Sequence, residues 1–278
     1  MIEKRILLLL VFCTYSVFGQ IKGIVIDSLS GQPVPFASVW IVDDNKGVTA
    51  DENGTFSFNP EYKNRSAVVT AIGYEQKTFR VLESSEIRLR SKNFELKEMI
   101  ISKWKETKQR EIGETENSIS QAFDNAPHID LKYFPYTEAY KKTKFIKKVS
   151  LYTDCRIENV RLKLHFYAVD ADGHPGEELL QQDYIVSVKK GVGKSNFNIS
   201  ELGLKMPING IFVGFEKLML ERNRTDKKYY PLVLYDYVPK DFIFTYSGGK
   251  WEKQVIGKKD QNSSGKAYEP AINLTLTN

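Results

Sequence analysis

Hydrophobic and polar positions alternate over short runs along most of the chain. The clearest run places Val160, Leu162, Leu164, Phe166 and Ala168 on one side and Arg161, Lys163, His165 and Tyr167 on the other. A period of two indicates a strand with one buried face. The polar row predicts a solvated strand face or, alternatively, a surface that meets an acidic partner.

Similar runs recur on both sides of a polar stretch, and no long segment has helical periodicity. Strands are predicted at 21–26, 36–42, 55–58 and 67–72, and again at 148–152, 184–188, 211–218, 231–235, 242–246 and 272–276. Residues 67–72 are nearly all apolar, which indicates a strand buried on both faces. Asp51, Asn53 and Gly54 form a turn signal, with Gly54 free to take a positive φ. Short strands at this spacing predict an all-β chain of two sandwiches, the second larger and of jelly-roll type.

The division of the chain follows from these patterns. Residues 91–110 are rich in Lys and Glu apart from Met99, Ile100 and Ile101, which indicates a connector carrying one short strand. We therefore predict a signal peptide at 1–19, a first domain at 20–90, a connector at 91–118 and a second β-sandwich at 119–278.

The first nineteen residues indicate export. Lys4 and Arg5 precede the apolar run 6–12, and small residues at Ser16 and Gly19 suit cleavage before Gln20. This is the pattern of a secretory signal peptide. The apolar run is too short to span a bilayer, and no later segment could cross one as a helix. We expect a protein of the periplasm, the outer membrane or the cell surface, with no transmembrane span in the mature chain.

Four ordered blocks in the first domain carry a family resemblance. They are Gly23 to Asp27, Gly31 to Val39, Gly47 to Phe56 and Ala71 to Tyr74. They resemble the carboxypeptidase-like regulatory domain of Bacteroidetes envelope proteins, which implies a transthyretin-like sandwich of seven strands. In families that carry it, this domain accompanies enzymes, surface proteins and receptors, and is not itself the peptidase.

Two later segments carry further resemblances. Residues 95–101 resemble the segment that follows this domain in TonB-dependent receptors, but about 170 residues remain, too few for such a receptor's barrel. Residues 164–180 and 207–216 resemble a β-sandwich of uncharacterised Bacteroidetes envelope proteins, which implies a fold and no activity.

Composition excludes some classes of function. The net charge is +5 and the lysines are scattered, so we predict no nucleic-acid binding. Without the signal peptide Cys155 is the one cysteine, and we interpret it as a small buried side chain.

Candidate chemistry is sparse. His128, His165 and His174 lack zinc-site spacing, and no nucleophile elbow or phosphate loop is present, so we predict no catalytic residue, no metal site and no cofactor. Asp170 and Asp172 before Gly173 could bind calcium or simply form an acidic turn. Paired carboxylates for glycoside hydrolysis could come from Glu177, Glu178, Glu216 and Glu221.

The remaining candidates are aromatic side chains that could stack on sugars. They are Tyr229, Tyr230, Tyr235, Tyr237, Tyr246 and Trp251. We expect a non-catalytic binding or structural accessory protein of the bacterial cell envelope, with an envelope protein or a glycan as partner. The alternatives are a carbohydrate-binding module and an unrecognised hydrolase acting on glycan or peptide.

Overall fold

The fold was analysed in a computed structural model of the chain. It describes residues 20–44, 46–92, 106–113, 121–122, 127–225, 228–238, 243–253 and 267–278. The predicted signal peptide and the predicted strand at Met99 to Ile101 lie outside these residues. The described chain is all-β, and its helices are the short 3-10 turns η1 (Pro60–Tyr62), η2 (Glu138–Tyr140), η3 (Ser200–Leu202) and η4 (Glu221–Asn223).

The first domain is the predicted sandwich of seven strands. Sheet 1 has the order β4-β1-β7, and sheet 2 has the order β3-β2-β5-β6. Its strands are β1 (Ile21–Asp27), β2 (Ser38–Ile41), β3 (Gly47–Thr49), β4 (Thr55–Phe58), β5 (Ser66–Thr70), β6 (Lys77–Arg80) and β7 (Ser84–Leu89). Val25, Val39, Phe56 and Val69 form the core between these sheets.

The turn before β4 forms as the sequence predicts. Gly54 has a φ of +71°, a conformation that favours glycine. Asp51 Oδ1 accepts hydrogen bonds from the backbone amides of Asn53 (2.8 Å) and Thr55 (2.9 Å). The side chain of Asp51 therefore fixes the turn locally.

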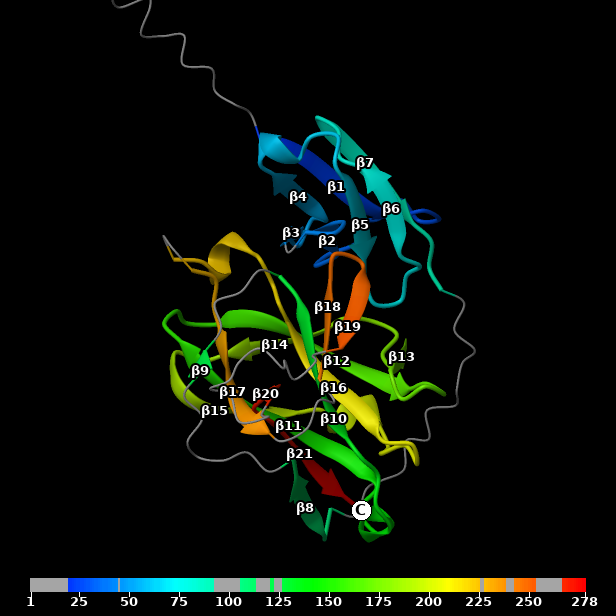
Figure 1. The fold of residues 1–278 in the computed structure, drawn as a ribbon, viewed down its shortest axis with the longest axis vertical. Coiled ribbons are helices and arrows are strands. Elements are labelled where there is room, and N and C mark those ends of the chain that lie inside the picture. The colour runs from blue at the N-terminus through cyan, green and yellow to red at the C-terminus, as the bar shows by residue number, and fades with distance from the viewer. Residues whose placement is uncertain are drawn as a thin grey trace, which may run out of the picture.

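The second domain is a larger sandwich of two sheets (Figure 1). Sheet 3 has the order β13-β12-β16-β10-β18-β19, with β14 also paired to β12. Its strands are β10 (Ile129–Phe134), β12 (Val160–Val169), β13 (Pro175–Glu178), β14 (Tyr184–Val188), β16 (Ile211–Lys217), β18 (Phe244–Ser247) and β19 (Lys250–Lys253).

Sheet 4 has the order β20-β17-β11-β21-β8, with β15 paired to β11 and β9 paired to β17. Its strands are β8 (Gln109–Ile112), β9 (Gln121–Ala122), β11 (Phe145–Cys155), β15 (Gly191–Asn198), β17 (Leu232–Val238), β20 (Ala267–Pro270) and β21 (Ile272–Thr277). Leu151, Leu162, Phe166 and Leu274 belong to the core between sheets 3 and 4. β8 lies inside the predicted connector, yet it pairs with β21.

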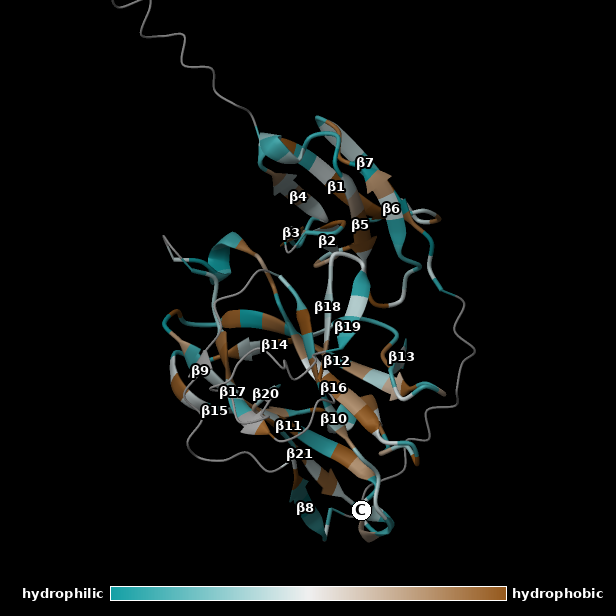
Figure 2. Cartoon of the chain, in the orientation of Figure 1, coloured by the Kyte–Doolittle hydropathy of each residue, from teal (hydrophilic) through white to brown (hydrophobic). Residues whose placement is uncertain are grey.

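The two sandwiches are stacked face to face, so that sheets 1 to 4 form four layers. Trp40 and Val68 of sheet 2 belong to one buried apolar cluster with residues of sheet 3, which include Leu131, Phe212 and Phe244. Strand β5 is therefore buried on both faces, as its sequence predicts. Its second face is covered by the other domain. Figure 2 shows the underlying alternation of hydrophobic and hydrophilic positions along the strands.

Most predicted strands are present, and the differences have local causes. The predicted strands do not include β15, which begins at Gly191, because Gly191 and Gly193 interrupt the pattern and adopt positive φ at an open edge. Strand β10 was not predicted because Asp130 and Lys132 interrupt its apolar pattern, although both are buried.

Gly214 permits the close approach of β10 and β16. A Cβ atom there would lie 2.1 Å from the backbone oxygen of Asp130 and 2.5 Å from Leu131 Cδ2. We predict that Gly214→Ala lowers the free energy of unfolding by about 3 kcal/mol, because the strands must separate. Gly173→Ala is the comparison, since that site is open and carries only the strain of φ +79°, about 1 kcal/mol. Urea unfolding measures both, and equal losses would disprove the close approach.

Candidate functional site

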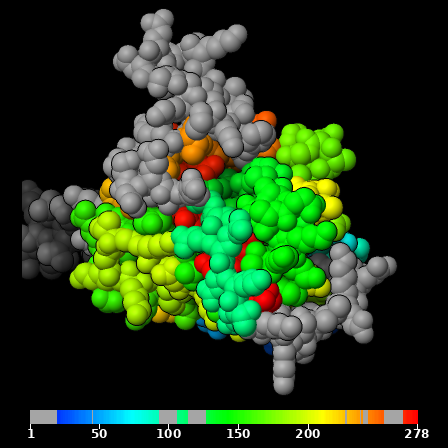
Figure 3. All heavy atoms as spheres, turned by 90° about the horizontal axis from the view of Figure 1, so that it is seen from below, coloured from blue at the N-terminus to red at the C-terminus, as the bar shows by residue number. Residues whose placement is uncertain are grey.

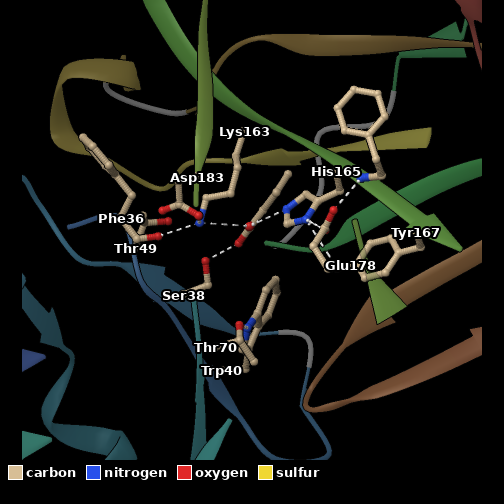
Figure 4. Close-up of polar contacts among 12 residues, drawn as sticks. Phe36, Ser38, Trp40, Thr49, Thr70, Lys163, His165, Tyr167, Glu178 and Asp183 are labelled. Atoms are coloured by element: carbon tan, nitrogen blue, oxygen red, sulfur yellow. Dashed lines mark hydrogen bonds and ion pairs between the residues drawn. The ribbon is translucent and has the colours of Figure 1, made fainter. Parts of the chain in front are cut away.

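The polar row of β12 is turned toward the first domain (Figure 4). Lys163 is 1% exposed and His165 is 3% exposed, while Leu162 and Leu164 of the same strand pack in the core behind them. The prediction of a solvated face was wrong for these two side chains, because β2 of the first domain covers them. The alternative prediction named acidic groups as partners, and these come from the same chain.

Glu216 on β16 is at the centre of this buried cluster. It is 2% exposed, and the strand register places it directly beside Lys163. Its Oε2 lies 3.0 Å from His165 Nε2 and 3.6 Å from Lys163 Nζ. Its Oε1 accepts a hydrogen bond from the hydroxyl of Ser38 on β2. One carboxylate thus joins the two domains.

His165 lies between two carboxylates. Its Nδ1 is 2.8 Å from Glu178 Oε2, opposite the contact of Nε2 with Glu216. Burial disfavours the charged imidazolium, but hydrogen bonds to Glu178 and Glu216 outweigh burial and raise the pKa of His165 to about 9. Tyr167 stacks on the ring with an interplanar angle of 8°. The imidazole is therefore protonated at neutral pH and donates to both carboxylates.

Lys163 provides the second link to the first domain. Its Nζ donates to the backbone oxygen of Phe36 at 2.8 Å and lies 3.0 Å from Asp183 Oδ1. Burial raises the pKa of Glu216, but this effect is outweighed. The charge of Lys163 and the hydrogen bond from His165 lower the pKa to about 2. Two cations and three carboxylates thus compensate one another where isolated charges would be costly.

The chemistry of the cluster is charge pairing across an interface. Ser38 donates to Glu216 rather than to His165, and a carboxylate whose pKa is lowered to about 2 is too weak a base to activate the serine as a nucleophile. Of the predicted carboxylates, Glu178 and Glu216 meet at His165, while Glu177 and Glu221 are exposed elsewhere. The arrangement joins the two domains through Glu216, and both ring nitrogens of His165 contact carboxylate oxygens.

Further contacts join the two domains around the charged cluster. The rings of Trp40 and Tyr246 meet edge to face with centroids 5.8 Å apart. At another point of the same interface, the Met219 amide donates to Thr49 Oγ1 at 2.9 Å. The interface therefore combines aromatic packing with hydrogen bonds.

The aromatic residues predicted as a ligand surface do not gather on one exposed face. Tyr230 is buried in the core of the second sandwich. Tyr235 is also buried, and its hydroxyl donates to Asp130. Tyr229 is half-buried, with the Arg224 guanidinium 5.4 Å from its ring centroid. Tyr230 and Tyr235 thus have no exposed ring face on which a sugar could stack.

The remaining predicted aromatics lie near the domain interface or outside the described side chains. Trp251 is half-buried and packs edge to face against Tyr167 and Tyr246, with centroids 5.1 Å apart in each pair. The side chain of Tyr237 is outside the described residues. Tyr246 therefore packs across the domain interface against Trp40, and Trp251 supports it from within sheet 3.

A second buried polar group is formed around Asp130. His128 Nε2 lies 2.6 Å from its Oδ2, which also accepts from Tyr235, and Thr245 Oγ1 donates to its Oδ1 at 2.7 Å. Burial opposes ionisation, but His128 and the hydroxyl donors hold the pKa of Asp130 below its usual value. This group connects sheet 3 to β17 of sheet 4.

The other candidate residues have structural surroundings. Asp170 Oδ1 accepts from the amides of Asp172 (3.0 Å) and His174 (2.8 Å), which is the predicted acidic turn. The described residues contain no group of three or more His, Cys, Asp or Glu that could hold a metal ion. Cys155 is a free, buried thiol whose Sγ is 3.2 Å from the Ile157 oxygen, and burial raises its pKa.

Together the fold and the site define an all-β protein in which two sandwiches share a buried charged interface. Residues 21–102 match the family model of the CarboxypepD_reg-like domain. The first domain is therefore a CarboxypepD_reg-like domain, as the four sequence blocks predict. A search of curated proteins found no match to the chain.

Solved structures give only distant likenesses. Two are of the Clostridial cysteine protease Cwp84, one after propeptide cleavage and one of its protease and lectin-like domains from Clostridium difficile. The first has a TM-score of 0.44 at 9% identity, and the second has a TM-score of 0.41 at 10% identity. Each alignment covers 87% of this chain. The chain spans 64% of the length of the first structure and 57% of the length of the second. A Bacteroides fragilis protein of unknown function has a TM-score of 0.22 at 11% identity, covering 93% of this chain and 96% of its own. TM-scores this low support no inference about this chain.

The protonation of His165 makes stability depend on pH. Because the pKa of His165 is raised in the folded state, its contribution to the free energy of unfolding is complete below about pH 6.5. That contribution is lost as the pH rises through about 9. We predict a loss of about 3 kcal/mol in the free energy of unfolding over this range, at about 1.4 kcal/mol per pKa unit. Urea unfolding at a series of pH values measures this loss.

His165→Gln removes the titrating group, so this variant is expected to be less stable at pH 6.5 and to vary less toward pH 9. His174→Gln, at an exposed position, is the matched control and retains the dependence of the parent. If the free energy of unfolding of His165→Gln depended on pH as strongly as that of the parent, another group would be responsible for the dependence.

Proposed function

We propose that this protein is a non-catalytic, exported binding or structural accessory protein of the bacterial cell envelope. The observation that carries the proposal is the covering of β12 by the first domain. His165, Glu178 and Glu216 are the groups most suited to acid–base chemistry, and they are paired with one another beneath β2. Their geometry favours a structural role.

Recognition through surfaces fits the rest of the molecule. The CarboxypepD_reg-like domain uses sheet 2 to bind the second sandwich, so sheet 1 and sheet 4 supply the outer sheet faces of the stack. In the described part of the chain, no helix is long and apolar enough to cross a membrane. A stack of sheets held by a buried interface provides fixed surfaces for a protein or glycan partner.

The alternative class is a hydrolase acting on peptide or glycan. The charged cluster is the place where such an activity would be sought, because it contains a histidine and two carboxylates. Its donors and acceptors are committed to partners at 2.8–3.0 Å, and β2 occupies the space in front of them. These contacts support the non-catalytic proposal.

A substrate screen tests the absence of catalysis. We expect the purified mature chain to release no product from a panel of peptide and polysaccharide substrates, because Glu216 is paired and covered. Folded Glu216→Gln is compared with Glu177→Gln, at an exposed site on β13. Turnover that is lost in Glu216→Gln and retained in Glu177→Gln would establish a hydrolase.

Export is tested by the mature N-terminus. The pattern of residues 1–19 predicts cleavage between Gly19 and Gln20. Expression in a Gram-negative host followed by fractionation and mass spectrometry is expected to find the envelope fraction beginning at Gln20. Replacing Leu8 and Leu9 by Arg should retain the uncleaved chain in the cytoplasm. An uncleaved parent in the cytoplasm would contradict export.

A further inference from the structure

Sheet 4 presents its outer face at the end of the stack opposite the first domain. Figure 3 views the molecule from this end, where β8, β11 and β21 lie together. Val149, Leu151 and Leu274 point into the core, so their neighbours along each strand point outward. We call these outward residues the polar face: Glu111 on β8; Lys148, Ser150 and Tyr152 on β11; Lys194 and Asn196 on β15; Asn273 and Thr275 on β21.

The floor of the polar face consists of small hydroxyl and amide side chains. Ser150, Asn273 and Thr275 occupy the two central strands and are buried between larger neighbours. Ser150 Oγ donates to Asn196 Oδ1 at 2.7 Å. Within the part of the chain that the structure describes, the hydroxyl of Thr275, a residue only 5% exposed, has no hydrogen-bond partner. An unmet buried hydroxyl is unfavourable, and a hydroxyl of a bound ligand would offset that cost.

One ion pair crosses above this floor. Lys194 extends from β15 over the central strands to Glu111 on β8, with Nζ 2.5 Å from Oε1. Asn273 Nδ2 donates to the same oxygen at 2.8 Å. The two charged side chains are 27% and 43% exposed, so solvent weakens their pairing and it contributes little. A ligand can therefore displace Lys194 at little cost and reach the floor.

The strands of this face carry a positive balance. Among the residues of the polar face itself, Lys148 and Lys194 outnumber Glu111. Lys189 and Lys190 are exposed in the turn that leads into β15. A negatively charged ligand is therefore favoured over a neutral one.

We propose that the polar face binds an acidic polysaccharide, a chain of sugar units bearing carboxylate groups. Sugar hydroxyls both donate and accept, which matches the mixed donors and acceptors of Asn196, Asn273 and Thr275. The half-buried Tyr152 supplies an aromatic ring beside them, and Lys148 and Lys190 attract the carboxylates. This inference rests on the proposed binding function and names its surface and its partner.

Two other polyanions fit the composition of the face less well. Single-stranded nucleic acid is bound by several stacking platforms, and the polar face has one aromatic residue. An anionic membrane surface calls for apolar side chains that enter the lipid, and the polar face has none of this kind among its eight residues. Both serve as competing ligands in the test.

Affinity electrophoresis in gels containing polygalacturonate tests the proposal, with pullulan, oligothymidylate and phosphatidylglycerol vesicles as further probes. Lys148→Ala removes a cation of the face, and Thr275→Val removes the unpartnered hydroxyl. The matched controls are Lys22→Ala and Thr55→Val, both exposed on the outer face of sheet 1. Urea unfolding of each variant checks that it is folded.

We expect polygalacturonate to retard the parent and both controls, and to bind Lys148→Ala and Thr275→Val about five- to tenfold more weakly. Thr275→Val should unfold at the same urea concentration as the parent or a higher one, since the hydroxyl it loses has no partner. Equal weakening by the controls, no effect of the face variants, or equal binding of any other probe would overturn the proposal.

The proposed function fails by a different result. Binding of polygalacturonate through another surface would refute the polar face and leave a binding protein. Absence of binding to polygalacturonate would likewise refute only this inference. Cleavage of polygalacturonate by the parent, lost in Glu216→Gln, would refute the non-catalytic function itself.

Discussion

The pairing of Glu216 with Ser38, Lys163 and His165 is the interaction on which the arrangement of the domains depends. A charged row on an internal strand face is compatible with burial only if every charge finds a partner. β12 supplies the cations, β16 supplies the central carboxylate, and β2 supplies the hydroxyl that completes it. Removing one partner would leave the others buried without compensation, which is far costlier than losing a surface ion pair.

This constraint explains why four sheets stack in one order. Sheet 2 places a polar strip at Phe36 and Ser38 beside an apolar strip at Trp40 and Val68. Sheet 3 has the complementary pattern, with charges on β12 and apolar side chains on β10 and β18. Matching both strips at once fixes the register of one domain on the other, so hydrophobic burial supplies attraction and the charges supply orientation.

The sequence predicted much of the fold because alternation and turn residues are local properties. Four strands of the first domain, the Asp51 turn and the alternation along β12 could be read from neighbouring residues, while the total of seven strands was implied by the family resemblance. The charged cluster could not, because Ser38 and Glu216 are separated by 178 positions and the resemblances that include them assign neither side chain a role. The one available indication was that Lys163 and His165 belong to a row whose opposite face is fully apolar. Tyr230 and Tyr235 were included among the surface candidates, although both are buried, since composition does not distinguish core tyrosines from exposed ones.

The position of β21 has a consequence for how the chain acquires its structure. Residues 272–277 form an interior strand of sheet 4, between β11 and β8, so that sheet cannot be completed until they have been delivered. The first domain is complete at Leu89 and, because a chain folds from its N-terminus as it emerges, can form much earlier. During that interval sheet 3 does not yet cover Trp40 and Val68, and these apolar side chains are exposed to other chains. Chains whose second sandwich is still incomplete can therefore associate through Trp40 and Val68, which the finished molecule keeps buried.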